Sequence, residues 1–161
     1  MIRRIKIGEV ELYRRVRLAS LRDSPEAFCS SYEEALSRSE GSWSEQVESS
    51  ASGSDRAIFV AMEDEPVGLA ALYRDEKDSE VGELIQVWIA PEKRGGPVAA
   101  ELLNEIFKWA AANKFFRVNA EVLAGNSRAL RFYKKCGFVQ SSNEGTLSNS
   151  GILLMREVER I

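Results

Sequence analysis

The sequence predicts a single α/β domain over residues 1–161, with a mixed, mainly antiparallel sheet of about six or seven strands flanked by helices. Three observations predict this class. Several apolar segments of strand length are joined by short polar turns, as in an antiparallel meander. Other segments carry apolar residues at spacings of three and four, as amphipathic helices do. One such helix falls between two strands, which is typical of a crossover to a parallel neighbour.

The first third of the chain is expected to be mainly helical. Residues 2–7 alternate loosely between apolar and basic, which predicts an edge or half-buried strand. Residues 10–21 show the helical spacing, with arginines on the outer face, and Ser24 with Pro25 ends this helix. Two short helical stretches and a serine-rich loop follow, at residues 28–37, 43–47 and 49–55.

The rest of the chain is expected to combine strands with two longer helices. Strands are predicted at residues 57–62, 67–73, 83–89 and 117–123, with short closing strands at 138–139 and 152–155. Helices are predicted at residues 98–110, stopped by Asn113, and at 126–136, ended by Gly137. A right-handed crossover should place the strand at 117–123 parallel to the strand at 83–89.

The charge balance excludes several classes of partner. The chain has 22 basic and 25 acidic residues and a net charge of −3, which is not the basic footprint of a nucleic-acid-binding protein. No apolar run approaches the roughly 20 residues of a membrane span. The first residues lack the continuous apolar stretch of a secretion signal, so we expect a cytoplasmic protein without nucleic-acid or membrane partners.

The chain contains no histidine, which removes the commonest general base and the commonest metal ligand. Its two cysteines, Cys29 and Cys136, do not make a four-ligand zinc site alone, so no metal is implied. We interpret them as free, mostly buried thiols. A disulfide between them and a nucleophilic Cys136 are the alternatives, and the second lacks an activating histidine.

The segment with the clearest chemistry is the strand–turn–helix junction at residues 86–103. The strand runs into Arg94, Gly95 and Gly96, and an amphipathic helix follows at once. Glycines let a ligand approach the backbone, and the first N–H groups of a helix have no internal partner. The helix dipole adds about half a positive charge there, so the junction fits a phosphate. A junction built only for packing is the alternative. The glycines of this junction match neither of the two common nucleotide-binding motifs.

Two strings at this junction and beyond it resemble one known family. The string VWIAPEKRG at residues 87–95 resembles motif A of the GCN5-related N-acetyltransferases (GNAT). The string NSRALRFYKKCGF at residues 126–138 is similar to that family's motif B. The run at residues 16–28 is loosely similar to the start of many such enzymes. The resemblance implies the GNAT fold and acetyl-coenzyme A as cosubstrate.

The resemblance also implies roles for individual residues. The pyrophosphate of acetyl-CoA would lie on the cradle that the family builds from Arg/Gln-x-x-Gly-x-Gly/Ala. The cradle residues here are Arg94, Gly95, Gly96, Pro97, Val98 and Ala99. The backbone of Val87, Trp88 and Ile89 would bind the pantetheine arm, and Asn126 and Ala129 would lie at the cofactor. Asn126 is also a good helix N-cap, and both roles are compatible.

The same resemblance implies a catalytic pair. Tyr133 would donate a proton to the departing thiolate, although a core tyrosine is the alternative. Glu83 is our candidate for the base that takes the proton of the amine, through water; Glu121 is a weaker one. An exposed strand-end carboxylate is the alternative for Glu83. Catalysis without a dedicated base also stays open.

Other charged and aromatic residues have simpler interpretations. Lys134 and Lys135 are expected to be solvated charges at a helix end. The acidic pair at residues 33–34 is expected to face solvent, and would favour a cationic amine if it lined the acceptor site. Trp43 is expected to be a core anchor.

Pro97 departs from the family pattern, which has glycine at this position. Proline has no N–H, so one donor to the pyrophosphate is missing, while the turn itself is compatible with proline. A hydrogen bond to a charged group contributes about 1.5–3 kcal/mol. Loss of this bond predicts coenzyme A binding that is weaker by roughly one to two powers of ten.

The sequence therefore predicts an N-acetyltransferase that moves an acetyl group from acetyl-CoA to a primary amine of a small molecule or peptide. The alternatives are a catalytically weak or inactive GNAT-like module that binds CoA or a partner protein, a transferase for a longer acyl group, and a protein that binds ATP or NAD. Dimers are common among such domains, so a homodimer is also expected.

Overall fold

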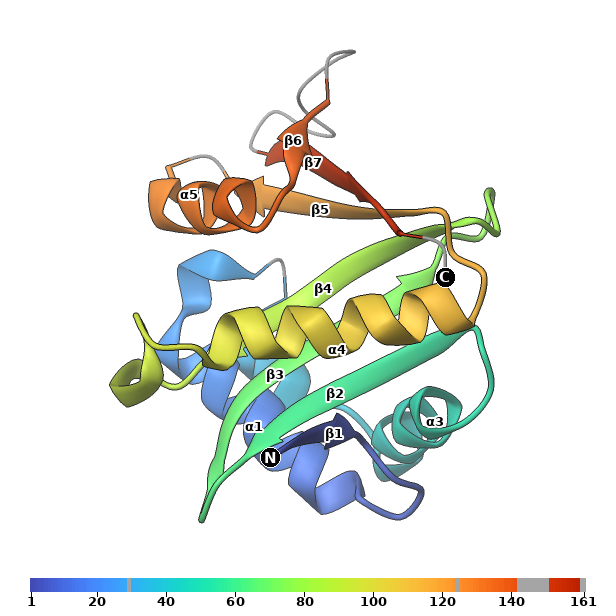
Figure 1. The fold of residues 1–161 in the computed structure, drawn as a ribbon. Coiled ribbons are helices and arrows are strands. Elements are labelled where there is room, and N and C mark those ends of the chain that lie inside the picture. Colours follow the sequence, from blue (N-terminus) through green and yellow to red (C-terminus); the bar gives the residue numbers. More distant parts are fainter. Residues whose placement is uncertain (29, 124, 142–150, 160–161) are drawn as a thin grey trace.

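The computed structural model describes residues 1–159 except 29, 124 and 142–150, and Figure 1 shows its fold. The chain forms a seven-stranded sheet with the order β1-β2-β3-β4-β5-β7-β6. The strands are β1 (Ile2–Arg4), β2 (Arg56–Met62), β3 (Pro66–Arg74), β4 (Val81–Ile89), β5 (Arg117–Leu123), β6 (Val139–Gln140) and β7 (Gly151–Glu157). The helices are α1 (Val10–Asp23), α2 (Tyr32–Leu36), α3 (Glu40–Ala51), α4 (Val98–Ala112) and α5 (Ser127–Lys135), with 3-10 turns at Pro25–Ala27 and Pro91–Lys93.

Only the β4–β5 pair is parallel in this sheet; the other neighbours pair antiparallel. The mixed, mainly antiparallel α/β fold predicted from the sequence is therefore confirmed, including the parallel step on either side of α4. The predicted edge strand at the N-terminus is β1, which pairs with β2. Asn113 and Gly137 follow α4 and α5 as predicted, and Gly137 has a positive φ of 95°.

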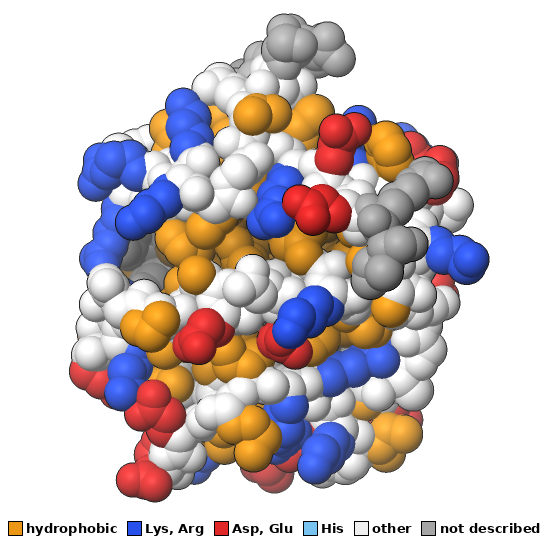
Figure 2. Space-filling model, viewed as in Figure 1, with side chains coloured by type: hydrophobic (Ala, Val, Ile, Leu, Met, Phe, Trp, Pro, Cys, Tyr) orange, Lys and Arg blue, Asp and Glu red, His pale blue; other side chains and the backbone are white. Residues whose placement is uncertain are grey.

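The molecule has two parts that meet at β4 and β5 (Figure 1). Helix α4 lies across β1–β4, while β5, β6, β7 and α5 form the upper part of the view. Figure 2 shows a band of hydrophobic side chains between α5 and β5 above and α4 below. This boundary is where the sheet changes from antiparallel to parallel pairing, and it positions the candidate site.

The larger part is held by a continuous apolar core. In α4 the fully buried residues Leu102, Ile106 and Ala110 follow the helical spacing and face β2 and β3. Gly68 of β3 leaves room for this helix, because a Cβ there would lie 2.9 Å from Leu102 Cδ1. On α1 and α3, the Tyr13 and Trp43 rings pack edge to face with centroids 5.7 Å apart. The ring of Trp43 is fully buried, as a core anchor would be.

Three expectations from the sequence are wrong in detail. Helix α3 continues to Ala51, into the predicted serine-rich loop, because Ser50 is fully buried there and Arg4 donates to the carbonyl oxygens of Ser50 and Gly53. Strand β4 starts at Val81 rather than at residue 83, since it pairs with β5 from that residue. The third error concerns α1, whose Arg17 is only 7% exposed and does not lie on the outer face.

None of the helices in the described part of the chain is both long and apolar enough to cross a membrane. Residues 142–150, between the two predicted closing strands, lie outside the described residues.

Candidate active site

The candidate site begins where β4 loses its parallel partner. Residues 81–84 of β4 pair with residues 117–120 of β5, and within the described residues the pairing stops there. Both strands continue, β4 to Ile89 and β5 to Leu123. Backbone N–H and C=O groups along this stretch of β4 thus face an opening rather than a neighbouring strand.

Gln86 marks the point where β4 turns away. It has a φ of 60°, which is uncommon for a residue other than glycine, and the pairing of β3 with β4 shifts register across it. The side chain is fixed, because the Tyr13 hydroxyl donates a 2.7 Å hydrogen bond to Gln86 Oε1. Strained residues of this kind gather at functional sites.

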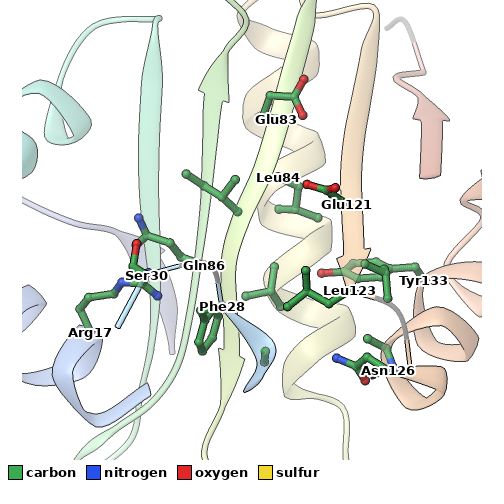
Figure 3. Close-up of a pocket in the computed structure, with 15 residues that line it drawn as sticks. Arg17, Phe28, Ser30, Glu83, Leu84, Gln86, Glu121, Leu123, Asn126 and Tyr133 are labelled. Atoms are coloured by element: carbon green, nitrogen blue, oxygen red, sulfur yellow. Dashed lines mark hydrogen bonds between the residues drawn. The ribbon is translucent and has the colours of Figure 1, made fainter. Parts of the chain in front are cut away.

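A cavity of about 390 Å³ fills the opening. Figure 3 shows Arg17, Phe28 and Gln86 on one side of it and Leu123, Asn126 and Tyr133 on the other, with Glu83 and Glu121 farther along the strands. Its walls therefore come from α1, β4, β5 and α5, which are far apart in sequence.

Tyr133 is buried in this wall. Its ring packs against Phe132 and Phe138 with centroids 5.4 and 5.3 Å apart. Burial raises the pKa of the hydroxyl, so it is protonated at neutral pH. This hydroxyl forms no hydrogen bond with another described residue, and Tyr133 lines the cavity. The residue is thus placed to donate a proton to a bound group.

Glu83 and Glu121 lie on the same face of neighbouring strands, since Glu83 is paired in register with Asn119. Glu83 is half-buried, and burial is the main cause that raises the pKa of its carboxyl; the charge of Asp75 adds to it. Glu121 is exposed. A carboxylate with a raised pKa at a cavity wall is suited to accept a proton.

A second cavity of about 320 Å³ adjoins the first, and Phe28, Val87, Asn126 and Ala129 line both. It leads to the turn before α4, which also contributes Arg94, Gly95, Gly96 and Ala99 to its lining. The two cavities form one groove from the turn to Glu83.

The turn itself leaves backbone donors free. Gly95 has a φ of 85°, and the Gly96 N–H donates to the Lys93 carbonyl oxygen at 3.3 Å. Pro97 is the N-cap residue of α4, one position before the first helical residue. The N–H groups of residues 98–100 find no acceptor within the described residues. An anion at this helix end would meet these N–H groups.

Arg94 is held beside the turn by a carboxylate from α1. Its Nε donates to the Ile89 carbonyl oxygen at 2.9 Å, and a terminal nitrogen donates to Asp23 Oδ2 at 2.5 Å. The indole N–H of Trp88 donates to the same oxygen at 3.0 Å. The hydrogen bonds from Trp88, from Ser24 and then from Arg94 lower the pKa of Asp23. The sequence predicts a role for the Trp88 backbone, and the structure adds a contact of its side chain.

The remaining predicted residues divide between the site and the surface. Asn126 caps α5, because its Oδ1 accepts from the Ala129 N–H at 3.2 Å, and both residues line the groove. Lys134 and Lys135 are exposed. Glu33 is exposed, and Glu34 closes a capping box with Ser31 at the start of α2.

Cys136 is a free, half-buried thiol, and burial raises the pKa of this thiol, which disfavours a nucleophilic role. Cys29 lies outside the described residues. Among the described side chains, no group of three or more Cys, Asp or Glu is placed to hold a metal ion.

Sequence reasoning missed three residues of this site: Arg17, Asp23 and Gln86. For Arg17 a signal was present, because it lies at helical spacing with the buried residues Tyr13, Val16, Ser20 and Leu21. A polar residue in the middle of the apolar strand at 83–89 was a weaker signal for Gln86. Nothing in the sequence connected Asp23 with Trp88 or Arg94.

Comparisons with known proteins agree with this geometry. The model of the acetyltransferase (GNAT) family matches residues 18–138. An uncharacterized N-acetyltransferase of Mycobacterium tuberculosis (strain ATCC 25618 / H37Rv) is 39% identical over 85 residues, which are 52% of this chain and 53% of that protein. The match with this relative thus spans about half of its length.

Solved structures share the fold over nearly the whole chain. A GNAT acetyltransferase from Streptococcus pneumoniae has a TM-score of 0.82 at 15% identity, and covers 99% of both chains. The GNAT domain of S. lividans PAT has a TM-score of 0.74 at 18% identity, over 97% of this chain and 89% of that one. The PaiA N-acetyltransferase from Thermoplasma acidophilum, in complex with coenzyme A, has a TM-score of 0.68 at 19% identity, over 98% of each chain.

The fold is the one that these acetyltransferase structures share. The chain belongs to the GNAT family, as the two motifs predicted.

Proposed function

We propose that the protein is an acetyl-CoA-dependent N-acetyltransferase that acetylates a primary amine of a small molecule or peptide. One observation carries the proposal: β4 separates from β5 after residue 84, and the resulting groove joins the N-terminus of α4 to the Tyr133 hydroxyl, where, within the described residues, neither the first helical N–H groups nor the hydroxyl has a hydrogen-bond partner. A homodimer and a cytoplasmic location stay predictions.

The groove has the features that coenzyme A needs. Gly95 and Gly96 leave the backbone of the turn uncovered, and the N–H groups of residues 98–100 suit a pyrophosphate. Within the described residues, Val87, Trp88 and Ile89 have no strand partner on the β5 side, which suits the amide groups of a pantetheine arm; the Ile89 carbonyl oxygen already accepts from Arg94. Bound acetyl-CoA supplies a thioester carbon for the amine to attack and a thiolate to leave.

Arg94 would contribute a positive charge at the phosphate end. In the free protein its guanidinium is paired with Asp23, so a bound pyrophosphate would compete with this carboxylate for it. The contact with the Ile89 carbonyl oxygen keeps the side chain at the turn while the partner changes.

Two side chains would move protons at the other end of the groove. Glu83, with its raised pKa, would take the proton of the ammonium group through water, because an amine attacks only with a free electron pair. Tyr133 is protonated at neutral pH and would donate its proton to the leaving sulfur. Holding amine and thioester together in the groove supplies a further part of the rate.

Pro97 favours a second candidate function. Because it offers no N–H at the start of α4, the chain is also a candidate for a catalytically weak or inactive module that binds CoA or a partner protein.

Calorimetric titration with acetyl-CoA and, separately, with ATP tests the proposal. Micromolar binding of acetyl-CoA without binding of ATP is expected, followed by amine-dependent thiol release that Tyr133→Phe reduces. Binding of acetyl-CoA without turnover on a panel of amines would favour the second candidate. The absence of acetyl-CoA binding would contradict the proposal.

A further inference from the structure

Arg17 of α1 is a buried guanidinium that forms no ion pair with the residues that the structure describes. It is only 7% exposed, and its Nη1 is fully enclosed without a hydrogen-bond partner. No side chain in the part of the chain that the structure describes accepts a hydrogen bond from Arg17; the residue's carbonyl oxygen accepts one from Ser20. The guanidinium N–H groups that face the cavities are thus not taken up by a described residue and can donate to a ligand.

The surroundings of Arg17 do not neutralise its charge. The ring of Phe28 covers one face of the guanidinium, with its centroid 4.9 Å from Arg17 Cζ. The polar groups that act on it electrostatically are Tyr13, Tyr73 and Arg38, none of which is a carboxylate. Burial lowers the pKa of Arg17, but arginine stays protonated in proteins. A buried unpaired charge is unfavourable unless a partner arrives.

The position of Arg17 separates it from the phosphate end of the groove. It lines the cavity between β4 and β5, and it lines a further cavity of about 650 Å³ beyond Gln86. It does not line the cavity at the turn, where Arg94, Gly95 and Gly96 lie. In Figure 3 Arg17 lies across β4 from Tyr133, on the side away from α5. An anion at Arg17 is therefore not a phosphate held at that turn.

A carboxylate fits this place best. With its face covered by Phe28, the guanidinium presents its edge, and the fork of N–H groups on that edge matches a carboxylate in two parallel hydrogen bonds. Gln86 lines the same two cavities, and its Oε1 is already occupied by Tyr13, which leaves its amide N–H groups as further donors.

We propose that Arg17 binds a carboxylate of the acceptor, so that the protein acetylates amines that also carry a carboxylate, such as free amino acids. The inference rests on the proposed function, and adds the substrate class to it. With its carboxylate on Arg17, the acceptor would hold its amine beside Gln86, in the cavity that Glu83 and Tyr133 also line.

The experiment compares acceptors that differ only in the carboxylate. The standard amino acids are tested one by one, together with leucinamide, methioninamide and phenylalaninamide, and turnover is followed as thiol release. For the three matched pairs, kcat/KM is expected to be at least about tenfold higher for the acid than for the amide. O-phosphoethanolamine tests a phosphate in place of the carboxylate.

Two substitutions of Arg17 and one control sharpen the comparison. Arg17→Met is expected to raise KM for the amino acids about 10- to 100-fold and to leave the amides unchanged, so that the preference disappears. Arg17→Lys keeps the charge without the fork of N–H groups, and its KM for the amino acids is expected to lie between those of the wild type and Arg17→Met. Arg15→Met, on the exposed face of the same helix, is expected to match the wild type. The Kd for acetyl-CoA is expected to stay unchanged in all three.

Stability separates this role from a structural one. Because the Arg17 guanidinium has no ion-pair or hydrogen-bond partner among the described residues, Arg17→Met is expected to melt at the same temperature as the wild type or higher. A Tm several degrees lower would overturn the proposal, as would equal turnover of acids and amides or a preference for O-phosphoethanolamine.

Calorimetric titration of the amino acids without acetyl-CoA separates the two proposals. Arg17-dependent binding without turnover would support the carboxylate site and contradict the proposed function. Turnover of simple amines without binding of any amino acid would support the proposed function and contradict the carboxylate site.

Discussion

The two parts of the molecule differ in how their strands are held. In the larger part, β2 pairs with β3 without a break from residue 56 to residue 61, and α4 covers these strands. Among the described residues, the part with β5, β6, β7 and α5 pairs with the larger part only along residues 81–84 of β4, and it packs on α4 where the Phe107 and Phe138 rings meet with centroids 5.9 Å apart. Stability thus resides mainly where both edges of a strand are paired, and the candidate site lies where one edge is left free.

Strand β4 belongs to both parts, and its two edges show the contrast within one element. The edge toward β3 is paired along most of its length, apart from the register shift at Gln86. The edge toward β5 is paired only over residues 81–84, within the described part of the chain. The rigid edge holds the strand in place, so that the open edge keeps its shape for a ligand.

Breaking the rigid part should have the largest effect. Leu102→Ala removes a fully buried side chain that packs against Gly68, and is expected to lower the free energy of unfolding by about 2–5 kcal/mol. Urea denaturation measures this, with the m-value as the check on two-state unfolding. Leu36→Ala, at an exposed position, is the control. A loss below about 1 kcal/mol would contradict this account of the core.

Removing the hydroxyl at the open edge should abolish most of the activity without affecting the fold. Tyr133→Phe keeps the ring contacts with Phe132 and Phe138, so the Tm is expected to stay within a few degrees. The loss of the proton donor is expected to lower kcat about 100-fold and to leave the Kd for acetyl-CoA unchanged. The control is Tyr32→Phe, because the Tyr32 hydroxyl binds Arg22 outside the groove. Full activity of Tyr133→Phe would exclude this role.

Replacing Glu83 should lower the activity without lowering the stability. Glu83→Gln is expected to lower kcat/KM about 10- to 100-fold near neutral pH, and to remove the rise of wild-type activity with pH. The folded-state pKa of Glu83 is raised, so its contribution to stability is present at low pH and lost as the pH rises through that pKa. Gln stays neutral, and the variant is expected to melt no lower than the wild type at pH 7.

Glu121→Gln distinguishes the role of Glu83 from that of Glu121, because Glu121 lies on the same face of the sheet but is exposed. An equal loss in both variants would assign the proton transfer to neither residue alone.

The smallest expected effect lies at the turn. Pro97→Gly restores an N–H at the start of α4 and is expected to lower the Kd for acetyl-CoA about tenfold. It is also expected to lower the free energy of unfolding by about 0.4–1 kcal/mol, because glycine raises the conformational entropy of the unfolded chain. Pro97→Ala restores the same N–H with less flexibility. Unchanged titration curves for both variants would show that the missing donor is irrelevant.

The sequence was sufficient for the fold because its information is local. The spacing along α4, the cap at Asn126 and the end of α5 before Gly137 each depend on neighbouring residues, and the structure agrees with each of them. The boundary of α3 depended on the burial of Ser50 and on Arg4 from another strand, so the serine-rich composition was misleading there.

The arrangement of the groove was less predictable, because it depends on contacts between distant elements. Asp23 and Arg94 are 71 residues apart in the chain and share a hydrogen bond. The φ of Gln86 follows from the separation of two strands rather than from its own preference. Arg17 was assigned to solvent by its residue type, although its position in the helical spacing indicated the core.

The hydrogen bond between Trp88 and Asp23 gives the protein an optical signal of its own. The indole N–H and the Arg94 guanidinium share one carboxylate oxygen, so any ligand that draws Arg94 away alters the electric field at Trp88. The other two tryptophans, Trp43 and Trp109, do not line the groove. Intrinsic fluorescence, with Trp88→Phe as the blank, therefore follows events at the turn in real time without a label.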